Sequence, residues 1–578
     1  MKGHRIVLGI AVGLTALISW LWLAGFLFCV FGRLPVHLAT PLTLLHYLPL
    51  YFALKPVKWL MDVSSLASLT LLALVAGAIL RNRNRTGPYG DARWASLWEV
   101  RKAGLFSESG IILGTRHGRL LCMPGWEHLM CFAPSGSGKG VGLVIPNLLH
   151  WPDSAIVHDV KGENFRLTSG YRAECGQKIY FFNPGDPGGH THRYNPFQFV
   201  SDNPGLRIDD LQKIAHLLLP KHDFWENEAR TLLVGLALHL LDQPDTTVTF
   251  GNLLCTIRET NFFDFAHDLL THHRAEMNPV ACMALNAFLQ KAEKERSGVL
   301  STLSSALELW ANPLIDAATS ASDFDLRRFK KERITLYVGV SPNNLHRLRP
   351  LLQILYQQAT DILTEKEPDP KTEPLGVLFL MDEFASLGKM TPFEQASAYF
   401  RGYRVRFMMI IQDLPQLERH YDRAGLNSFL GMSKVKVTFA SGDYQTAEVI
   451  SKYLGTFGAQ TESVSERQGL SLLSGQGSRS LSQTSRFLLL PQEILQLPPD
   501  DEIIMVEGLP PIRARKIRYF HEPVFQSRMR PPVTLSPIKP VIRELKEGPP
   551  PVAREMTEEE KELCRQQFNI EELPETAA

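Results

Sequence analysis

Ala133-Pro-Ser-Gly-Ser-Gly-Lys-Gly140 is the stretch of sequence that decides the fold. It follows the apolar run 129–132 and precedes Val141-Gly-Leu-Val-Ile-Pro146, which can begin a helix. This strand–loop–helix order is typical of a phosphate-binding loop. Glycines let backbone N–H groups converge on phosphate oxygens, and the helix N-terminus adds partial positive charge. We expect Lys139 to reach the β- and γ-phosphates of a nucleotide. The expected phosphate-loop residues are Pro134, Ser135, Gly136, Ser137, Gly138, Lys139, Gly140 and Val141.

The loop departs from the strict phosphate-loop pattern at both ends. That pattern begins with Gly and ends in Ser or Thr, whereas Ala133 and Gly140 stand at these places. The missing hydroxyl removes one usual Mg²⁺ ligand. Taken alone, the stretch could also be a flexible Gly-Ser turn with a chance lysine.

A second signal favours the nucleotide site. Val377-Leu-Phe-Leu-Met381 predicts a buried strand, and two carboxylates, Asp382 and Glu383, follow it directly. The first can hold Mg²⁺, directly or through water, and the second can orient and polarise an attacking water. Both must lie at the carboxyl end of the strand beside the phosphate loop, because doubly wound sheets bind ligands there. The alternative is a solvated strand end.

A third predicted strand, 405–411, ends in Gln412, and a basic turn with Arg401 precedes it. An amide at the end of a neighbouring strand can sense the γ-phosphate, although a capping role is also open. Arg401 can cross a subunit boundary and stabilise charge in the transition state. The other interpretation of Arg401 is an exposed surface turn.

Strand and helix patterns alternate through the chain after residue 85. Short β-rich runs separated by helical periodicity predict an α/β fold with a mostly parallel, doubly wound sheet. Residues 203–325 carry helical periodicity with almost no strand signal, so we expect an all-α domain inserted into the α/β domain. The nucleotide-binding domain is then divided into residues 86–202 and 326–526. The predicted strands are 155–158, 179–182, 334–340, 377–381, 405–411 and 435–439.

The first 85 residues predict a membrane anchor. Residues 6–31 form an uncharged apolar run long enough to span a bilayer, and 63–80 reaches the lower end of spanning length. Lysine and arginine at the outer ends of both runs place both termini and the bulk of the chain in the cytoplasm, with 32–62 as a short external loop. A signal peptide is the alternative for the first run, and a buried hairpin for the second.

Composition excludes several classes of protein. Lys plus Arg is 61 and Asp plus Glu is 60, so no global basic bias indicates a nucleic-acid binder. Any DNA contact must come from a local patch or from a ring of subunits. The 7 cysteines are scattered without a Cys-x-x-Cys pair, which argues against a disulfide framework or structural zinc and for a reducing compartment.

Two segments predict loops or disorder. Residues 461–486, rich in Ser, Gly and Gln, predict a mobile loop. Residues 527–578 predict a Pro-rich and then acidic tail, largely disordered, with a short helix from about Thr557 to Phe568 started by a capping box. The helical insertion and the tail are candidates for reading substrates, whereas a purely solubilising tail is equally open. The tail's acidic and apolar residues are Glu558, Glu559, Glu560, Glu562, Leu563, Phe568, Ile570, Glu571, Glu572 and Leu573.

The sequence resembles the TraG-like coupling proteins of bacterial type IV secretion, the inner-membrane ATPases of conjugation. Two N-terminal spans before a large cytoplasmic part fit that family, and so does Gly after the loop lysine. The resemblance covers about residues 1–525 and leaves the tail out. Its motifs are Ser137 to Asn147, His158-Asp-Val-Lys-Gly-Glu163, Tyr194-Asn-Pro-Phe197, Phe224-Trp225, Ala229-Arg230, Glu295-Arg-Ser-Gly298, Met381 to Gly388, Ile411-Gln412-Asp413, Leu509-Pro-Pro-Ile512 and Lys516-Ile517.

The resemblance implies a RecA-like P-loop NTPase domain that uses ATP and Mg²⁺, an inserted all-α domain, and a homo-hexamer around a central channel. By position, Lys139 matches the phosphate-loop lysine, Asp382 the Mg²⁺ carboxylate and Glu383 the catalytic carboxylate. Arg401 falls at the place of the trans-acting arginine and Gln412 at that of the γ-phosphate sensor. Asp159 and Glu163 end the strand after the loop, with structural and catalytic roles both open.

The implied function is an inner-membrane ATPase that recruits substrates and feeds them to a type IV secretion channel. The implied partners are unspecific DNA, a relaxase with accessory proteins or effector proteins, the channel's inner-membrane components and the lipid bilayer. Two alternatives are an FtsK-type DNA translocase and a nucleotide-binding membrane adaptor with little hydrolysis. The helical insertion and only two spans argue against the FtsK type.

Overall fold

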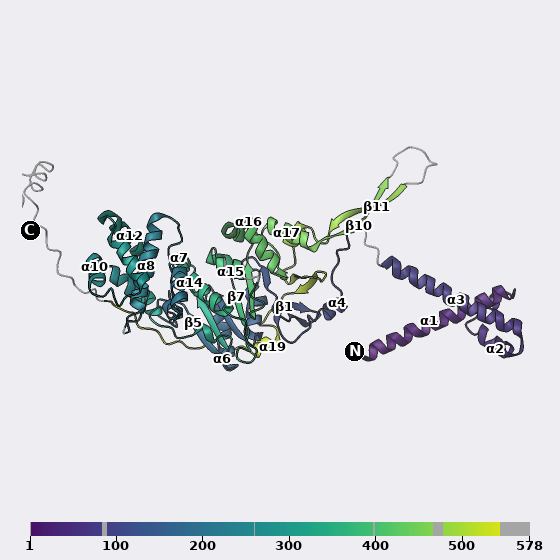
Figure 1. The fold of residues 1–578 in the computed structure, drawn as a ribbon. Helices are drawn as coiled ribbons and strands as arrows, with labels where there is room; N and C mark the ends of the chain where they lie inside the picture. Colours follow the sequence, from purple (N-terminus) through teal and green to yellow (C-terminus); the bar gives the residue numbers. More distant parts are fainter. Residues whose placement is uncertain are drawn as a thin grey trace, which may run out of the picture. The chain divides into compact units, whose positions relative to one another are not determined.

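The computed structural model describes residues 2–83, 89–244, 246–258, 261–396, 399–465 and 478–543. The chain divides into two compact units (Figure 1). The first comprises Met1–Asp91 and Thr456–Arg486, and the second comprises Ala92–Gly455 and Phe487–Ala578. Each unit is described by itself.

In its described residues, the first unit consists of three α-helices, one short 3-10 helix and a hairpin. The helices α1, α2 and α3 pack together around Ala24, Phe28, Leu44 and Met61. The sequence stretch predicted as a mobile loop contributes two paired strands, β10 and β11, so the prediction was wrong for their residues; 466–477 lie outside the described part. The elements are α1 (Lys2–Phe31), η1 (Val36–Leu38), α2 (Thr43–Ala53), α3 (Lys55–Arg83), β10 (Thr456–Ser465) and β11 (Ser478–Phe487).

One stretch of the described residues, Lys55–Val75 in α3, is long and apolar enough to cross a membrane. The described part of α1 contributes a shorter apolar stretch, Leu17–Phe31. The helix that contains the predicted second span starts at Lys55, before the apolar run 63–80, and its first two turns carry Trp59, Leu60 and Met61. The expected loop 32–62 is not a simple loop, since it contains α2.

A single large sheet organises the second unit. Its strand order is β2-β1-β13-β12-β9-β3-β8-β7-β4-β6-β5. Strands from β9 to β5 in this order are parallel, as the sequence predicted. The antiparallel strands β1, β2, β12 and β13, which extend the sheet on one side, were not predicted. The strands are β1 (Ile111–Arg116), β2 (Arg119–Met123), β3 (Leu129–Phe132), β4 (Ser154–Asp159), β5 (Lys178–Phe182), β6 (Ile334–Gly339), β7 (Val377–Met381), β8 (Val405–Ile411), β9 (Val435–Thr438), β12 (Asp501–Val506) and β13 (Ile512–Arg515).

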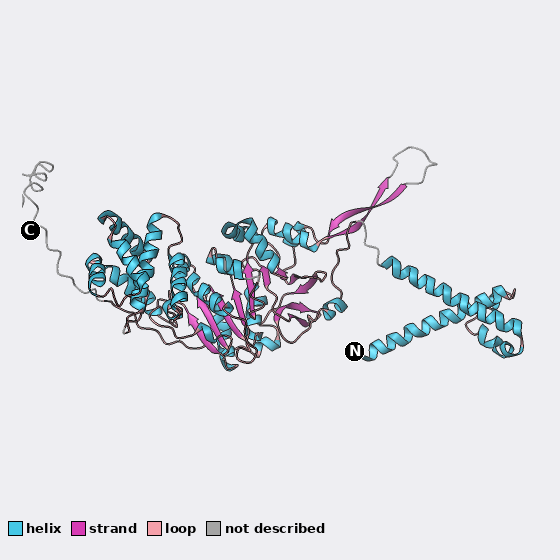
Figure 2. Cartoon of the chain, viewed as in Figure 1, coloured by secondary structure: helices cyan, strands magenta, loops and turns pink. Residues whose placement is uncertain are grey.

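Helices cover both faces of this sheet (Figure 2). Along β3, Met130 and Phe132 enter one hydrophobic core, whereas Leu129 and Cys131 enter the other. A strand buried on both faces has a continuous apolar sequence, which is why β3 and β7 lack polar residues and β8 contains only one, the buried Arg406. The helices packed along the sheet are α4 (Leu97–Lys102), η2 (Gly140–Val144), α5 (Ile145–His150), α6 (Glu163–Glu174), α14 (Leu345–Thr364), η6 (Phe384–Leu387), α15 (Thr391–Ala396), α16 (Leu414–Met432), α17 (Tyr444–Leu454), α18 (Pro491–Leu495) and α19 (Pro523–Gln526).

All described elements between β5 and β6 are helical. Asp223 and Asn312 cap α8 and α13 by accepting hydrogen bonds from backbone N–H groups of their first turns. Helix α8 forms the centre of this insertion and packs against α7, α11 and α12. The elements are η3 (Pro196–Phe199), α7 (Pro204–Leu218), α8 (Phe224–Leu241), α9 (Phe250–Arg258), α10 (Phe262–His272), α11 (Pro279–Leu289), α12 (Glu293–Ala306), η4 (Glu308–Ala311), α13 (Pro313–Ala318) and η5 (Leu326–Arg328).

The chain after α19 differs from the predicted disordered tail. Residues 527–543 follow a defined extended path with backbone hydrogen bonds to the rest of the unit. Proline punctuation, the basis of the prediction, is compatible with extended chain as well as with disorder. Residues 544–578, with the expected helix Thr557 to Phe568, lie outside the described residues.

Candidate active site

The phosphate loop joins β3 to the helical segment that begins at Gly140. Ala133 N donates a 2.9 Å hydrogen bond to the Ile411 carbonyl, which ties the start of the loop to β8. Ser137 donates both its backbone N–H and its hydroxyl to the Pro134 carbonyl, at 3.2 and 2.7 Å. Gly136 and Gly138 have φ of 76° and 87°, in the left-handed region that favours glycine. The loop is therefore a preformed turn.

The structure brings Lys139 together with both predicted carboxylates. Its Nζ lies 3.3 Å from Asp382 Oδ1 and 3.1 Å from Glu383 Oε1. The Lys139 side chain is only 13% exposed, so this ion pair is poorly screened by water. Strand β7 delivers the two carboxylates, because they are the first residues after its last strand residue, Met381.

Asp382 is the carboxylate best suited to a divalent cation. Burial raises its pKa, and the charge of Lys139 opposes that rise. Its buried Oδ1 forms the 3.3 Å ion pair with Lys139, and among the described residues no group donates a hydrogen bond of good geometry to it. A buried carboxylate oxygen without a hydrogen bond fits a hard cation such as Mg²⁺. Gly140 supplies no hydroxyl, and the hydroxyl of Ser137 is engaged within the loop.

Gln412 lies between the loop and the carboxylates. Strand β8 pairs with β3 on one side, Ile411 opposite Phe132, and with β7 on the other, Met409 opposite Met381. These strands are parallel, so their carboxyl ends meet at one edge of the sheet. Gln412 follows β8 at this edge, adjacent to both partners.

Arg401 is not brought to this cluster. It precedes β8 and so belongs to the opposite edge of the sheet, roughly 20 Å away at the usual rise of a strand. Its side chain is 59% exposed and its Nη2 lies 3.3 Å from Glu127 Oε1. Arg401 therefore makes no contact with the Lys139 cluster of its own chain.

The neighbouring strand β4 adds buried polar residues to the same edge. His158 contacts Tyr356 Oη through Nδ1 at 3.0 Å and Ser386 Oγ through Nε2 at 3.3 Å. Burial lowers the pKa of His158 to about 3, so the ring is neutral near pH 7. The predicted site residues did not include Tyr356 or Ser386, although Ser386 lies within the family-like motif Met381 to Gly388.

Asp159 ends β4 beside the carboxylates of β7. Phe165 N donates to its Oδ2 at 2.8 Å, which fixes the start of α6. Burial raises the pKa of Asp159 to about 6, and the nearby negative charges of Asp382 and Glu163 act in the same direction. The hydrogen bond supports a structural role for Asp159.

A second lysine, which the site prediction omitted, reaches the phosphate loop. Lys516 follows β13, and its Nζ donates to the Ser137 carbonyl at 3.2 Å. The same Nζ lies 4.1 Å from the ring centroid of Phe439, which follows β9. Burial lowers the pKa of Lys516, and the neighbouring Glu502 opposes this. In the sequence, the only sign of a role for Lys516 was its place in the family-like motif Lys516-Ile517.

Comparison with known families identifies relatives over most of the chain. The family described as "Type IV secretory system Conjugative DNA transfer" matches residues 93–539. Protein VirD4 of Rhizobium rhizogenes is 33% identical over 510 residues, which cover 84% of this chain and 72% of that protein. Conjugal transfer protein TraG of Escherichia coli is 27% identical over 557 residues, covering 86% and 88%. The family match ends at residue 539, so the expected end of the resemblance near residue 525 was wrong.

Solved structures share the fold. The conjugative coupling protein TrwBdeltaN70, in its unbound monoclinic form, has a TM-score of 0.54 at 18% identity and covers 76% of this chain and 99% of its own. TrwB in complex with ADP and Mg²⁺ has a TM-score of 0.53 at 18% identity, with coverage of 77% and 94%.

Proposed function

The chain belongs to the family of type IV secretion coupling proteins of conjugative DNA transfer, and we propose that it drives this transfer by hydrolysing ATP at the Lys139–Asp382–Glu383 site. Membership of this family favours a secretion coupling protein over an FtsK-type translocase. The remaining alternative is an adaptor that binds nucleotide and hydrolyses little.

One observation carries the proposal of hydrolysis. Lys139 Nζ lies within 3.3 Å of two carboxylates that follow strand β7, and Gln412 follows β8, the strand between β3 and β7. A site for binding alone needs the loop and its lysine. The added carboxylate pair and the amide are the groups that a hydrolytic site requires.

In this proposal each residue has a separate task. Backbone N–H groups of the loop 134–141 and the ammonium of Lys139 bind the phosphates of ATP. Asp382 holds Mg²⁺, directly or through water; the cation, when bound, neutralises the charge that develops on the phosphates. Glu383 orients the attacking water and accepts its proton, and Gln412 contacts the γ-phosphate. The solved complex of TrwB with ADP and Mg²⁺ supports a nucleotide and Mg²⁺ as the groups that bind here.

Arg401 is proposed to complete the site of a neighbouring subunit. Its exposure and its place on the far edge of the sheet support a trans role. A ring with this arrangement, six subunits in the proposal, would join each Arg401 to the next phosphate loop. The central channel of such a ring would contact DNA without sequence preference.

The proposed setting is the bacterial inner membrane, with two spans, both termini and the bulk of the chain in the cytoplasm. The apolar stretch Lys55–Val75 supports the second span. The proposed partners are a relaxase with its DNA and accessory proteins, or effector proteins, and the inner-membrane part of the secretion channel.

The test compares the full-length protein in detergent with its Glu383→Gln variant. ATP turnover is measured with and without DNA, and plasmid transfer is measured in cells. We expect the variant to bind ATP, to lose turnover and to fail in transfer. Equal turnover of the two proteins would refute hydrolysis at this site; transfer supported by Glu383→Gln would favour the adaptor.

A further inference from the structure

The antiparallel part of the sheet contacts the phosphate loop and the helix that follows it. Lys516, which follows β13, donates from Nζ to the Ser137 carbonyl at 3.2 Å. Asn147 of α5 accepts from Ile112 N through Oδ1 at 2.8 Å and donates through Nδ2 to the Ile112 carbonyl at 2.9 Å. Ile112 belongs to β1, and Asn147 is only 1% exposed. The loop and its helix are therefore tied to β13 and β1 as well as to the parallel strands.

The contact from Lys516 has a consequence for the next residue of the loop. The Ser137 carbonyl and the Gly138 N–H belong to one planar, trans peptide group, in which the C=O and N–H bonds point to opposite sides of the chain. Lys516 holds the carbonyl on the side of β13, so the Gly138 N–H is directed to the other side. Gly138 directly precedes Lys139, and its N–H is one of the loop donors expected to bind phosphate. One hydrogen bond from Lys516 thus sets the direction of a donor to the nucleotide.

Lys516 is itself held in place by three contacts. Its Nζ lies 4.1 Å from the ring centroid of Phe439, close enough for a cation–π interaction. Its backbone N–H donates to the Asp500 carbonyl at 2.8 Å. The segment η2 passes close by, since a Cβ at Gly142 would lie 3.2 Å from the Ile517 carbonyl oxygen and 3.7 Å from Lys516 Cβ. The fold therefore fixes the ammonium group against the loop.

A second lysine has the same kind of surroundings but makes its hydrogen bond away from the loop. Lys436 of β9 donates from Nζ to the Ser433 carbonyl at 2.6 Å and lies 5.0 Å from the ring centroid of Tyr453. Burial lowers the pKa of Lys436, as it does that of Lys516. Ser433 precedes β9, which runs parallel to β3, so this bond lies toward the edge of the sheet opposite to the phosphate loop. Lys436 is therefore a reference for losing a partly buried lysine without losing a contact to the loop.

We propose that Lys516 is a positioning residue of the nucleotide site, which orients the Ser137–Gly138 peptide so that the Gly138 N–H faces the β-phosphate. This inference rests on the proposed nucleotide site. It assigns Lys516 to binding and not to the hydrolytic step, because the β-phosphate is present in ATP and in ADP. Loss of a contact that substrate and transition state share raises KM and leaves kcat unchanged.

Nucleotide titration of the full-length protein in detergent tests this role. Lys516→Met should raise the Kd of ADP and of ATP by the same factor, about tenfold, the scale of one charge-assisted hydrogen bond. The effect on turnover should lie in KM, with kcat at saturating ATP within about twofold of the wild type. Lys516→Arg keeps a charged donor and should recover most of the affinity. Lys436→Met is the matched control and should leave both Kd values unchanged.

Thermal unfolding without nucleotide checks that the variants fold. If Lys516→Met does not fold, Lys516→Gln takes its place, because its polar side chain is too short to reach the loop and should cost the same affinity. Wild-type affinity for ADP in the Met or Gln variant would overturn the role of Lys516. An equal loss of affinity in Lys436→Met, or no recovery in Lys516→Arg, would also overturn it, because either result would indicate a general structural effect.

A loss confined to ATP, or to kcat, would contradict the assignment to the β-phosphate. A failure of the proposed hydrolysis would be recognised separately, as normal turnover in Glu383→Gln. That result would leave the ADP titration valid, because binding of ADP involves no hydrolysis.

Discussion

Lys139 Nζ lies 3.1 Å from Glu383 Oε1, although 244 positions separate the two residues in the sequence. The contact exists because β8 places the loop strand β3 and the carboxylate strand β7 on its two sides. A phosphate bound by Lys139 must compete with this carboxylate for the same ammonium group. If Glu383 is the proposed base, binding and hydrolysis of a nucleotide should therefore respond to its replacement in opposite directions.

The first prediction concerns the competition between Glu383 and a phosphate for Lys139. Glu383→Gln should lower kcat for ATP at least about 100-fold, because it removes the proposed base, while ATP binds as tightly as in the wild type or more tightly. Steady-state turnover and fluorescent-nucleotide titration measure the two quantities. Lys139→Ala should lower binding as well as turnover. Glu507→Gln, at an exposed carboxylate paired with Lys434, is the control and should change neither. Weaker ATP binding in Glu383→Gln would contradict the competition.

The second prediction concerns Gln412. Gln412→Ala should lower kcat by about tenfold and affect ATP affinity much less, because a contact to the γ-phosphate matters most as that group departs. ADP affinity, which involves no γ-phosphate, should stay unchanged. Gln445→Ala, at an exposed amide that donates to Glu418, serves as the control. A Gln412→Ala protein with equal losses of ADP and ATP affinity would indicate a structural role in the loop instead.

The third prediction concerns the trans action of Arg401. Oligomers of Arg401→Ala alone, or of Lys139→Ala alone, should hydrolyse little ATP. A mixture should regain activity, because an intact Lys139 site of one subunit can then meet an intact Arg401 of its neighbour. Turnover is measured as a function of mixing ratio. Arg423→Ala, at an exposed arginine of α16, should hydrolyse ATP without mixing. Mixtures no more active than their separate components would rule out trans action.

The fourth prediction concerns pH. Burial raises the pKa of Asp159 to about 6, above its ordinary value. The folded chain therefore binds the proton more tightly than the unfolded chain, and the stability from this group is complete below about pH 4 and lost as pH rises through 6. Asp159→Asn stays neutral throughout. The free energy of unfolding of the wild type should therefore fall, relative to that of the variant, by at most about 3 kcal/mol across this range. Thermal unfolding at pH 4.5 to 8 measures the difference.

The control for this titration is Asp202→Asn, at an exposed carboxylate, which should follow the wild type at every pH. A constant difference in melting temperature between Asp159→Asn and the wild type would show that Asp159 does not titrate in this range.

The fifth prediction concerns topology. His37 is exposed between α1 and α2, and His117 is exposed in the turn between β1 and β2. In cells carrying a variant without exposed Cys175, a cysteine introduced by His37→Cys should react with a membrane-impermeant maleimide. The one introduced by His117→Cys should react only after the inner membrane is permeabilised. Protection of His37→Cys in intact cells would refute the external loop.

Local pattern was enough to predict the central sheet and the loop. The runs 377–381 and 405–411 are apolar, except for Arg406, because both faces of these strands are covered. Such a run followed by polar residues marks the carboxyl edge of a parallel sheet. The antiparallel strands β1, β2, β12 and β13 escaped prediction, because short strands at one side of a sheet carry weak patterns. Residues 527–543 were mistaken for a disordered tail for a related reason: an extended segment is stabilised by its partners, and its own composition does not reveal them.

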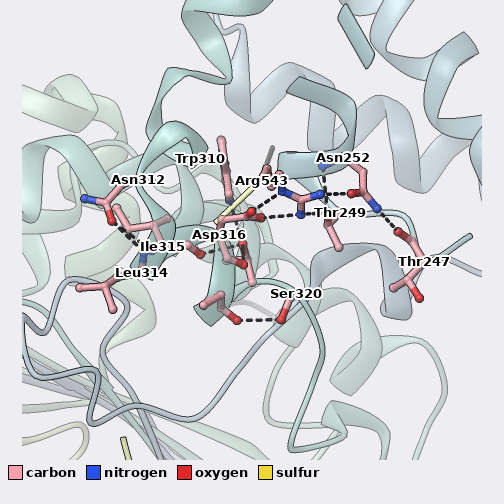
Figure 3. A network of polar contacts seen from close by, with 12 residues as sticks. Thr247, Thr249, Asn252, Trp310, Asn312, Leu314, Ile315, Asp316, Ser320 and Arg543 are labelled. Atoms are coloured by element: carbon pink, nitrogen blue, oxygen red, sulfur yellow. Dashed lines mark hydrogen bonds and ion pairs between the residues drawn. The ribbon is translucent and has the colours of Figure 1, made fainter. Parts of the chain in front are cut away.

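By itself, the sequence determined which functional groups the candidate site contains. They are a glycine-rich loop with Lys139, a buried strand followed by Asp382 and Glu383, and the amide of Gln412. The tertiary structure decided their relationships. Strand order places Gln412 between the loop and the carboxylates, puts Arg401 on the far edge, and adds His158 and Lys516 to the site. It also pairs Arg543 with Asp316, 227 positions away (Figure 3). Sequence patterns report periodic, local burial, whereas these pairings depend on contacts between segments whose separation along the chain carries no periodic signal.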